Sequence, residues 1–227
     1  SVQLGNDGDL QTVTLAGAVS TVPGMTTASV VTRRSIHGAL PTSSVSSGCR
    51  IVGAGMRRDG RLGTAAVTAS SGATPFGFPF DRRGRLFVSE AFGGTPGASA
   101  LSSYGLSRSG AAGVISGTVP TLQTAACWVA VTGSGRFAYA ANTGSNSITG
   151  YAVSAAGTLT RLDADGITAA TGQVATDLAL SRSSRFLYSR GAGDGSISAF
   201  EVEGDGALTP AGVVDGLPSS AVGLAAR

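Results

Sequence analysis

The chain has 227 residues, a formal net charge of +3, 13% charged residues, 35 glycines and a mean hydropathy of +0.23. A chain of this length buries roughly 70% of its unfolded surface, so the composition favours a globular protein with a sizeable core over disorder. No apolar run approaches the roughly 18 residues of a membrane helix, and the basic residues are scattered without interleaved aromatics. We therefore expect neither membrane insertion nor a nucleic-acid partner.

The first part of the chain, residues 1–73, is the least regular. Residues 1–15 fit two short strands joined by a turn, which is only half of the unit that recurs later. Thr27 to Thr32 suits an inner strand, and Ile51 to Met56 suits an outer one. Between them Pro41 lies where a strand should pair, and proline removes a ladder hydrogen bond. We expect degenerate or partial repeats here.

From residue 74 onward one pattern recurs in three units, 74–110, 123–157 and 171–206. Each unit has an apolar inner run, a second run that begins near an arginine, a third alternating run and a glycine turn. The turn glycines recur about every 50 residues and are Gly8, Gly60, Gly110, Gly157 and Gly206. This period predicts an all-β fold, a β-propeller of four-stranded antiparallel blades with four to five blades present in a single domain, 1–227.

The end of the chain bears on how the ring closes. Ala221 to Ala225 matches the inner strand predicted at Thr176 to Leu180, whereas the N-terminal residues match outer strands. Closure removes an open sheet edge, but one strand of a blade shared by both termini is missing. We therefore expect an N-terminally truncated part of a longer propeller, in preference to a compact ring of about five units.

A family resemblance is carried by three blocks: TPFGFPFDRRGRLFVSEAFGG (74–94), QTAACWVAVTGSGRFAYAANTGSNSITGYAV (123–153) and TDLALSRSSRFLYSRGAGDGSISAFEVEGDGALTP (176–210). They resemble the lactonase-family seven-bladed propellers, relatives of 6-phosphogluconolactonase and of the carboxymuconate cyclases. The resemblance covers residues 74–227 and implies lactone-ring chemistry at one end of the central channel, using Arg, His and Glu side chains.

This chain departs from the family pattern at the start of each inner strand. Where many members carry Pro-Arg-His, it has Pro75-Phe76-Gly77, Ala126-Cys127-Trp128 and Ala175-Thr176-Asp177. No basic clamp for a phosphate is evident either. The resemblance therefore implies the propeller, and a lactone without a phosphate, but not the family's catalytic set.

Polar residues are predicted at one mouth of the channel, where the inner strand of each blade begins and the second strand ends. Superposing the blades on their arginines places Glu90, Ala141 and Arg190 in equivalent slots. Glu90 and Arg190 are the predicted catalytic pair, with the arginine polarising a carbonyl and the glutamate activating water. An ordinary ion pair is the alternative. The predicted substrate-binding residues are Gln123, Thr124, Asn142 and Asp177.

Other chemically distinctive residues are interpreted as structural. A cysteine nucleophile needs a base, and the only histidine, His37, lies in the degenerate region, so Cys127 and Trp128 are assigned to the core. The stretch Asp163-Ala164-Asp165-Gly166 begins like a calcium loop but lacks the later ligands, which favours a simple turn. Two cysteines and one histidine do not form a recognisable zinc site. We expect no metal and no cofactor.

Two functions follow. The first is hydrolysis of a small, non-phosphorylated lactone by a carboxylic ester hydrolase. The second is a non-catalytic propeller that binds a small ligand or a protein partner, or serves as a scaffold. The expected partner is a small-molecule lactone or carbohydrate-like ligand, the expected state is a monomer, and a secreted or periplasmic location is favoured over a cytoplasmic one.

Overall fold

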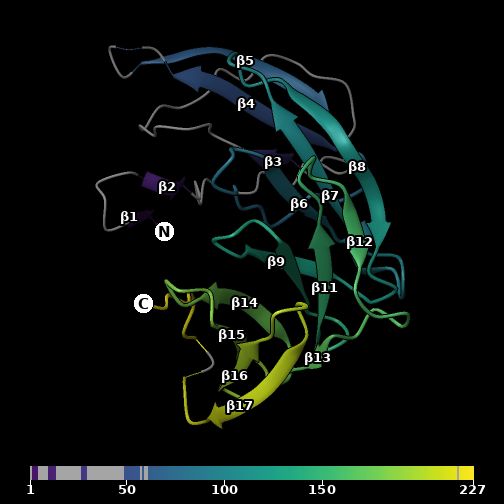
Figure 1. Cartoon of the computed structure of the whole chain (residues 1–227), viewed down its shortest axis with the longest axis vertical. Coiled ribbons are helices and arrows are strands. Elements are labelled where there is room, and N and C mark those ends of the chain that lie inside the picture. The colour runs from purple at the N-terminus through teal and green to yellow at the C-terminus, as the bar shows by residue number, and fades with distance from the viewer. Residues whose placement is uncertain are drawn as a thin grey trace.

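The computed structural model describes residues 2–4, 10–13, 27–29, 49–56, 58, 61–218 and 220–227. Within these residues the structure is almost entirely β, and its sheets follow one another along an arc (Figure 1). A separate antiparallel hairpin pairs β1 (Val2–Leu4) with β2 (Leu10–Val13). A short 3-10 helix, η1, spans Phe92–Gly94. Among the described residues, no helix is long and apolar enough to cross a membrane.

Each of the four sheets along the arc is one blade. Blade 1 consists of β3 (Thr27–Ser29), β4 (Arg50–Met56) and β5 (Leu62–Ala69). Blade 2 consists of β6 (Leu86–Glu90), β7 (Ala100–Leu106) and β8 (Ala112–Pro120). Its inner segment, residues 75–80, is held to β6 by the isolated bridges Pro75–Glu90 and Phe80–Leu86.

Blades 3 and 4 are complete. Blade 3 consists of β9 (Ala126–Val131), β10 (Phe137–Asn142), β11 (Ser147–Val153) and β12 (Leu159–Arg161), with β13 (Ala169–Ala170) also paired to β11. Blade 4 consists of β14 (Ala175–Leu180), β15 (Phe186–Gly191), β16 (Ser196–Val202) and β17 (Leu208–Val214). The predicted all-β fold is confirmed, and blades 2 to 4 are antiparallel as predicted.

The core lies between blades because strand side chains alternate between the two faces of a sheet. Leu86 of β6 packs back against Ile51 of blade 1, whereas Phe87 packs forward with Ala138 of blade 3. In blade 3, Tyr139 packs forward against Leu187 of blade 4. Each fully buried apolar side chain stabilises the fold by roughly 1.5–3 kcal/mol, so every blade is stabilised mainly by its neighbours.

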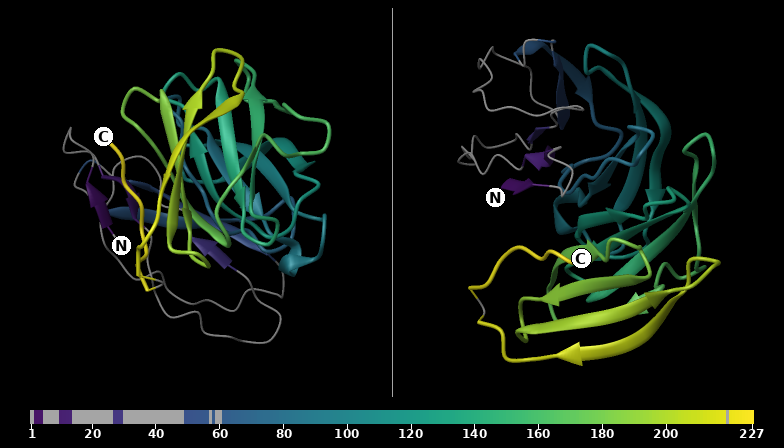
Figure 2. Two further views of the ribbon diagram at one scale, coloured as in Figure 1. Left: turned by 90° about the horizontal axis from the view of Figure 1, so that it is seen from below. Right: turned by 60° about the vertical axis from the view of Figure 1, so that its left-hand side comes forward.

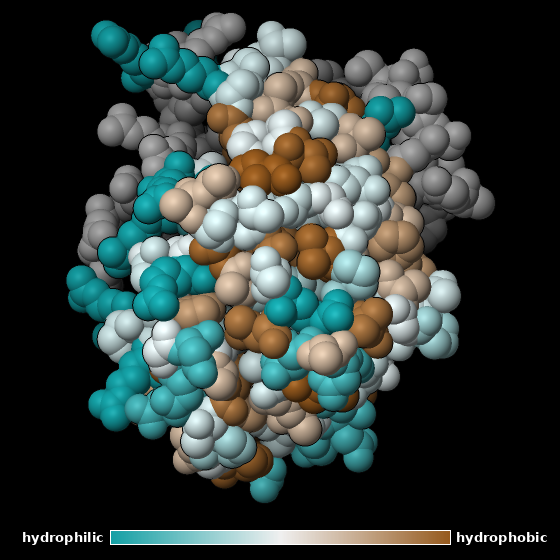
Figure 3. All heavy atoms as spheres, turned by 45° about the vertical axis from the view of Figure 1, so that its right-hand side comes forward, coloured by the Kyte–Doolittle hydropathy of each residue, from teal (hydrophilic) through white to brown (hydrophobic). Residues whose placement is uncertain are grey.

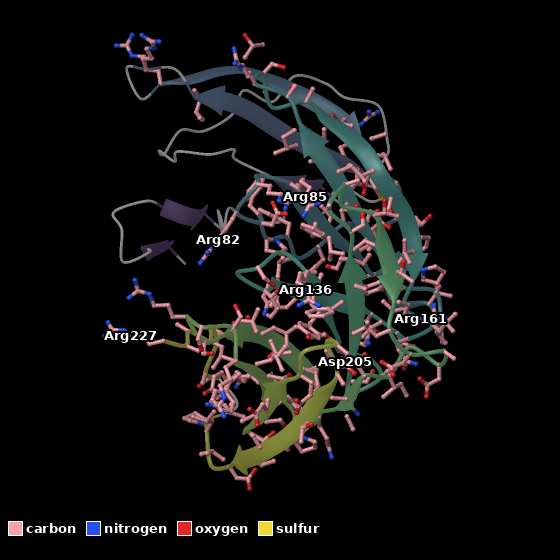
Figure 4. All side chains as sticks on the ribbon, viewed as in Figure 1. Arg82, Arg85, Arg136, Arg161, Asp205 and Arg227 are labelled. Carbon is pink, nitrogen blue, oxygen red and sulfur yellow. The ribbon has the colours of Figure 1, made fainter. Side chains whose placement is uncertain are left out.

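Arginines at the turns reinforce this stacking. Arg85 forms a buried ion pair with Asp81 at 2.6 Å, and its Nη1 donates a hydrogen bond of 3.0 Å to the carbonyl of Ser154 in blade 3. Arg136 in turn donates from Nη2 to the carbonyl of Gly204 in blade 4 at 3.2 Å. Figure 4 shows Arg85 and Arg136 at successive positions along the arc. A guanidinium therefore links each of these blades to the next.

The recurring turn glycine has two physical causes. Gly206 has φ +95°, a left-handed conformation that glycine adopts without steric cost. A Cβ at this position would also lie 2.5 Å from the ring of Phe137 in the preceding blade. The turn glycine that defined the repeat is thus required by backbone conformation and by the close approach of two blades.

Two details differ from the sequence-based expectations. In blade 1, β3 pairs with β4 in parallel, with Thr27 opposite Arg50, so this blade does not follow the antiparallel pattern. The predicted inner strand at residues 221–225 is wrong, because the described residues after β17 contain no strand. Their amides bond elsewhere, for example Leu217 N–H to the carbonyl of Gly195. Pro41 and His37 lie outside the described residues.

Apolar side chains are exposed on outer strands. Val114 on β8 and Val213 on β17 are exposed, and in Figure 3 apolar side chains form separate patches among polar and weakly polar ones. Isolated exposed apolar residues are normal for a globular protein. Figure 2 shows the tail after β17 turning back toward the inner side of blade 4.

Candidate functional site

The strand register shows which predicted site residues occupy equivalent positions in different blades. Glu90 and Asn142, at the ends of β6 and β10, pair with Pro75 and Ala126 at the starts of their inner segments. Arg190 lies one position earlier in β15, opposite Asp177. The predicted equivalence of Glu90 and Arg190 is therefore wrong by one residue.

The error has a local cause. The turn before the second strand is closed by Asp81 N–H to the carbonyl of Arg85 in blade 2, but by Thr132 N–H to the carbonyl of Phe137 in blade 3. Blade 2 is therefore one residue shorter at this point, and its arginine is not equivalent to the arginines of the other blades. A shift of one residue turns a side chain to the opposite face of a sheet. Glu90 consequently faces back toward blade 1, whereas Arg190 faces forward from blade 4.

Glu90 is 0% exposed and lies between blades 1 and 2. Its Oε1 accepts hydrogen bonds from Gly72 N–H at 2.7 Å, Ser102 Oγ at 2.8 Å, and Ser70 Oγ and Tyr104 OH at 3.3 Å. Burial raises the pKa of this carboxyl group, and these hydrogen bonds oppose the rise. Glu90 thus anchors the loop that enters blade 2.

Three of the four predicted substrate-binding residues also form hydrogen bonds within the protein. Asn142 is fully buried, and its Nδ2 donates to the hydroxyls of Ser147 and Thr149. Gln123 donates from Nε2 to the carbonyl of Asp165 at 3.0 Å. Thr124 Oγ1 accepts a hydrogen bond from Gly97 N–H at 3.2 Å.

The structure does bring together two predicted residues, Asp177 and Arg190, which we call the Asp177–Arg190 corner. A β-bulge at Thr176 shifts the register, so that Ala175 lies opposite Gly191 but Asp177 lies opposite Arg190. Bulges re-aim side chains and are common next to active sites. The bulge places a carboxylate and a guanidinium on directly paired residues of β14 and β15.

The corner is held by short polar contacts. Arg190 is 3% exposed and donates from Nη1 to Thr176 Oγ1 at 3.2 Å and from Nη2 to the carbonyl of Pro218 at 3.1 Å. Asp177 Oδ1 accepts from Leu178 N–H at 2.8 Å, and Oδ2 accepts from Leu224 N–H at 2.7 Å. Two backbone segments of the tail therefore contact the two charged groups.

The electrostatics of the corner suit acid–base chemistry. Burial raises the pKa of the Asp177 carboxyl group, while the two amide hydrogen bonds and the charge of Arg190 hold the rise in check. Each carboxylate oxygen has a second lone pair available for water. A carboxylate poised in this way accepts a proton, and the guanidinium stabilises negative charge developing on a nearby oxygen.

An aromatic pair on the neighbouring inner strands was not predicted as part of a site. Phe76 is 46% exposed, and its ring lies 5.0 Å from that of Trp128, centroid to centroid, with 38° between the planes. Trp128 packs against the core between blades 3 and 4, as expected, but is only partly buried. Trp128 lies within the register shift of β9, as Thr176 lies within that of β14, and the apolar pattern of the sequence does not reveal either shift.

The remaining candidates behave as structural residues. Cys49 and Cys127 are free thiols, and burial raises the pKa of Cys127, which disfavours the reactive thiolate. Gly166 N–H donates to the carbonyl of Asp163, and Ile167 N–H donates to Asp165 Oδ1. This confirms the predicted turn. Within the described part of the chain, no group of three potential metal ligands occurs.

A hollow of about 280 Å³ lies near the turns that join the first and second strands of blades 3 and 4, and Arg136 and Arg185 line it. Arg136 already donates to Gly204, and Arg185 forms an ion pair of 3.0 Å with Glu201. We place the candidate site at the other end of the blades, at the Asp177–Arg190 corner, because the register there pairs a guanidinium with a carboxylate whose pKa is raised by burial.

Comparison with known families matches residues 102–219 to the family described as lactonase, 7-bladed beta-propeller. No curated protein matches the chain. Similar solved structures include a 6-phosphogluconolactonase candidate from Bacteroides uniformis, with a TM-score of 0.57, 17% identity and coverage of 71% of this chain and 50% of that one. The periplasmic gluconolactonase of Pseudomonas aeruginosa has a TM-score of 0.55 and 20% identity, with coverage of 72% and 48%.

A protein of unknown function from Desulfotomaculum acetoxidans is similar to the same degree, with a TM-score of 0.56, 15% identity, and coverage of 70% of this chain and 46% of that one. The chain thus spans about half the length of these structures. At such identities the likeness concerns the fold alone.

Proposed function

The chain belongs to the lactonase family of seven-bladed β-propellers, and on that premise we propose that it hydrolyses a lactone at the Asp177–Arg190 corner. The observation that carries the proposal is the register of β14 and β15, which pairs a buried guanidinium with a carboxylate whose pKa is raised. These are the two groups that ester hydrolysis by water needs: a general base and a stabiliser of the oxyanion.

The reaction at the corner balances without a cofactor. Asp177 takes a proton from water as the water oxygen attacks the lactone carbonyl, and Arg190 stabilises the negative charge on the carbonyl oxygen. The ring C–O bond then breaks, and the proton on Asp177 passes to the departing ring oxygen. The product is the open-chain hydroxy acid, and Asp177 returns to its starting state.

The tail supports the assignment of Arg190. The carbonyl oxygen of Pro218 accepts a hydrogen bond from Arg190 Nη2, as the carbonyl of a lactone would. A substrate bound in this way takes the place of the Pro218 carbonyl. The corner contains one arginine, whereas phosphate recognition commonly uses a bidentate or clustered arrangement, so we propose a lactone without phosphate. A monomer outside the cytoplasm remains our expectation, and the periplasmic Pseudomonas relative supports that location.

The test is lactone hydrolysis followed by pH-stat. Asp177→Asn should lower kcat/KM about 10²–10⁴-fold, the usual contribution of a general base. The matched control is Asp205→Asn, which changes an exposed turn carboxylate on the same blade and should leave the rate unchanged. A rate lost in Glu90→Gln but kept in Asp177→Asn would restore the sequence-based hypothesis and reject the corner.

One observation favours the second function, a binding propeller without catalysis. Both charged groups of the corner are already contacted by the tail, through Pro218 and Leu224. Lactones that bind to the folded protein but remain intact would support this alternative.

A further inference from the structure

The hollow between the turns of blades 3 and 4 is separate from the candidate site, since it lies at the other end of the blades. Its volume of about 280 Å³ is near the lower end of the range for small-molecule sites, roughly 300–1,000 Å³. The charged residues that line it are Arg136, Arg185 and Glu203. Arg185 is paired with Glu201, whereas no carboxylate of the described residues lies within ion-pair distance of Arg136.

The neighbouring interface, between blades 2 and 3, contains a comparable arginine that does have a carboxylate. Arg85 donates from Nη1 to the carbonyl of Ala155, in the turn between the third and fourth strands of blade 3, at 3.1 Å. Arg136 donates from Nη2 to the carbonyl of Gly204, in the same turn of blade 4, at 3.2 Å. The Arg85 guanidinium is also held by Asp81, whose Oδ2 lies 2.7 Å from Nε and 2.6 Å from Nη2. Within the described part of the chain, Arg136 has no such second partner.

Thr132 occupies the position in blade 3 that corresponds to Asp81 in blade 2. Both residues begin the turn before the second strand: Asp81 Oδ1 accepts from Arg85 N–H at 2.9 Å, and Thr132 Oγ1 accepts from Phe137 N–H at 3.2 Å. The two arginines differ by one position in register, but each lies four residues after this turn residue. Thr132 lines the hollow together with Arg136. The turn of blade 3 therefore places a neutral hydroxyl, and not a carboxylate, beside the hollow.

The lining also supplies hydrogen-bond donors. The Arg136 guanidinium lies over the ring of Phe137, with Cζ 5.1 Å from the centroid, and stacking through the face leaves the N–H groups at the edge available. Ser184 Oγ accepts from Gly133 N–H at 2.8 Å, and its own O–H has no acceptor among the described residues. A Cβ at Gly133 would lie 3.3 Å from Arg82 Nη2, so a further guanidinium lies beside these turns.

We propose that this hollow binds a small carboxylate anion, with the Arg136 guanidinium and the Ser184 hydroxyl as its donors. The ligand carboxylate pairs with Arg136 as the Asp81 carboxylate pairs with Arg85, and pairing of this kind is among the stronger hydrogen-bonded contacts in proteins. Glu203 repels an anion at this site, while its Oε1 accepts from Thr209 Oγ1 at 2.7 Å. The proposal is independent of the lactone chemistry proposed above.

The test is isothermal titration calorimetry of the folded chain at low ionic strength, because salt screens exposed charges. The probes are lactate, lactamide, which replaces only the carboxylate by an amide, and inorganic phosphate. Lactate should bind and lactamide should not. Phosphate should bind more weakly than lactate, because Glu203 repels a dianion more strongly than a monoanion.

Four variants locate the binding. Arg136→Gln should weaken lactate binding about tenfold or more, since it removes the charged donor. Thr132→Asp should weaken it to a similar degree, because it supplies a carboxylate from within the chain. Glu203→Gln should tighten binding about two- to fivefold, because a like charge is removed. The matched control is Arg108→Gln, which removes an exposed arginine in a turn of blade 2 and should leave the affinity unchanged.

A loss of affinity in Arg136→Gln together with a gain in Glu203→Gln supports the proposal, and circular dichroism confirms that the variants are folded. Absence of lactate binding, or lactamide binding as tight as that of lactate, overturns it. Equal affinities in the four variants and the unchanged protein also overturn it. Phosphate binding more tightly than lactate rejects a carboxylate as the ligand.

Discussion

The face of blade 3 that is turned toward blade 4 and the equivalent face of blade 4 carry aligned residues but have different surroundings. The register aligns Phe137, Tyr139, Ala141 and Ile148 of blade 3 with Phe186, Tyr188, Arg190 and Ile197 of blade 4. The blade 3 face is buried by blade 4, and Tyr139 OH donates to the carbonyl of Gly206. On the blade 4 face, Phe186, Tyr188 and Ile197 are only partly buried, while the tail lies over Arg190.

The difference between these faces shows that one strand position can hold either a packed apolar side chain or a hydrogen-bonded guanidinium. Three of the four aligned positions keep their side-chain type, and the fourth changes from Ala141 to Arg190. A buried guanidinium needs hydrogen-bond partners, and blade 4 provides them through Thr176 and the tail. The aligned position therefore holds a packed apolar side chain in blade 3 and a hydrogen-bonded guanidinium in blade 4.

The largest expected effect comes from introducing an arginine into blade 3, at the position that aligns with Arg190 of blade 4. Ala141→Arg introduces a guanidinium into a slot that is 0% exposed and surrounded by the apolar core between blades 3 and 4. We expect a loss of about 3–5 kcal/mol or failure to fold, measured by urea denaturation. Replacing the charged side chain by an apolar one of similar length, Arg190→Met, should cost less, about 1–2 kcal/mol, because it removes hydrogen bonds that include those to Thr176 and Pro218 but leaves no uncompensated charge. Equal losses would contradict the distinction between the faces.

The second test compares the two aligned tyrosines. Tyr139→Ala removes a fully buried ring and its hydrogen bond to Gly206, and should lower the free energy of unfolding by about 3–5 kcal/mol. Tyr188→Ala removes a partly exposed ring and should cost about 1–2 kcal/mol. Thermal unfolding of both variants measures the difference. If the two losses agree, the forward face of blade 4 is as well covered as that of blade 3.

The repeat could be predicted from the sequence because its physical causes recur in each blade. Turn glycines are needed for left-handed φ and for close packing, as at Gly206, and inner and second strands need apolar residues on both faces. Such constraints leave a period in the sequence. The orientation of Glu90 could not be predicted in this way. Blade 2 is one residue shorter before its second strand, and a shift of one residue moves a side chain to the other face of the sheet.

The site was predicted in part. Asp177 and Arg190 were both named, but their pairing depends on a bulge at Thr176, which apolar periodicity does not reveal. The exposed aromatic pair of Phe76 and Trp128 was missed for a related reason. An aromatic residue in an inner strand has the same pattern whether it is covered by a neighbour or faces open space, and only the arrangement of the blades distinguishes Phe76 from Phe87.

The smallest expected effect concerns the hydrogen bond from the tail to Asp177. It tests whether this bond controls the pKa of the Asp177 carboxyl group. Leu224→Pro removes the N–H that donates to Asp177 Oδ2. That hydrogen bond favours the ionised carboxylate, so its loss should raise the pKa of Asp177 further. Because a general base acts when deprotonated, the acidic limb of the kcat/KM profile should move to higher pH. Leu224→Ala keeps the N–H and should leave the limb in place. A limb that moves to lower pH, or moves equally in both variants, would show that the tail amide does not control Asp177.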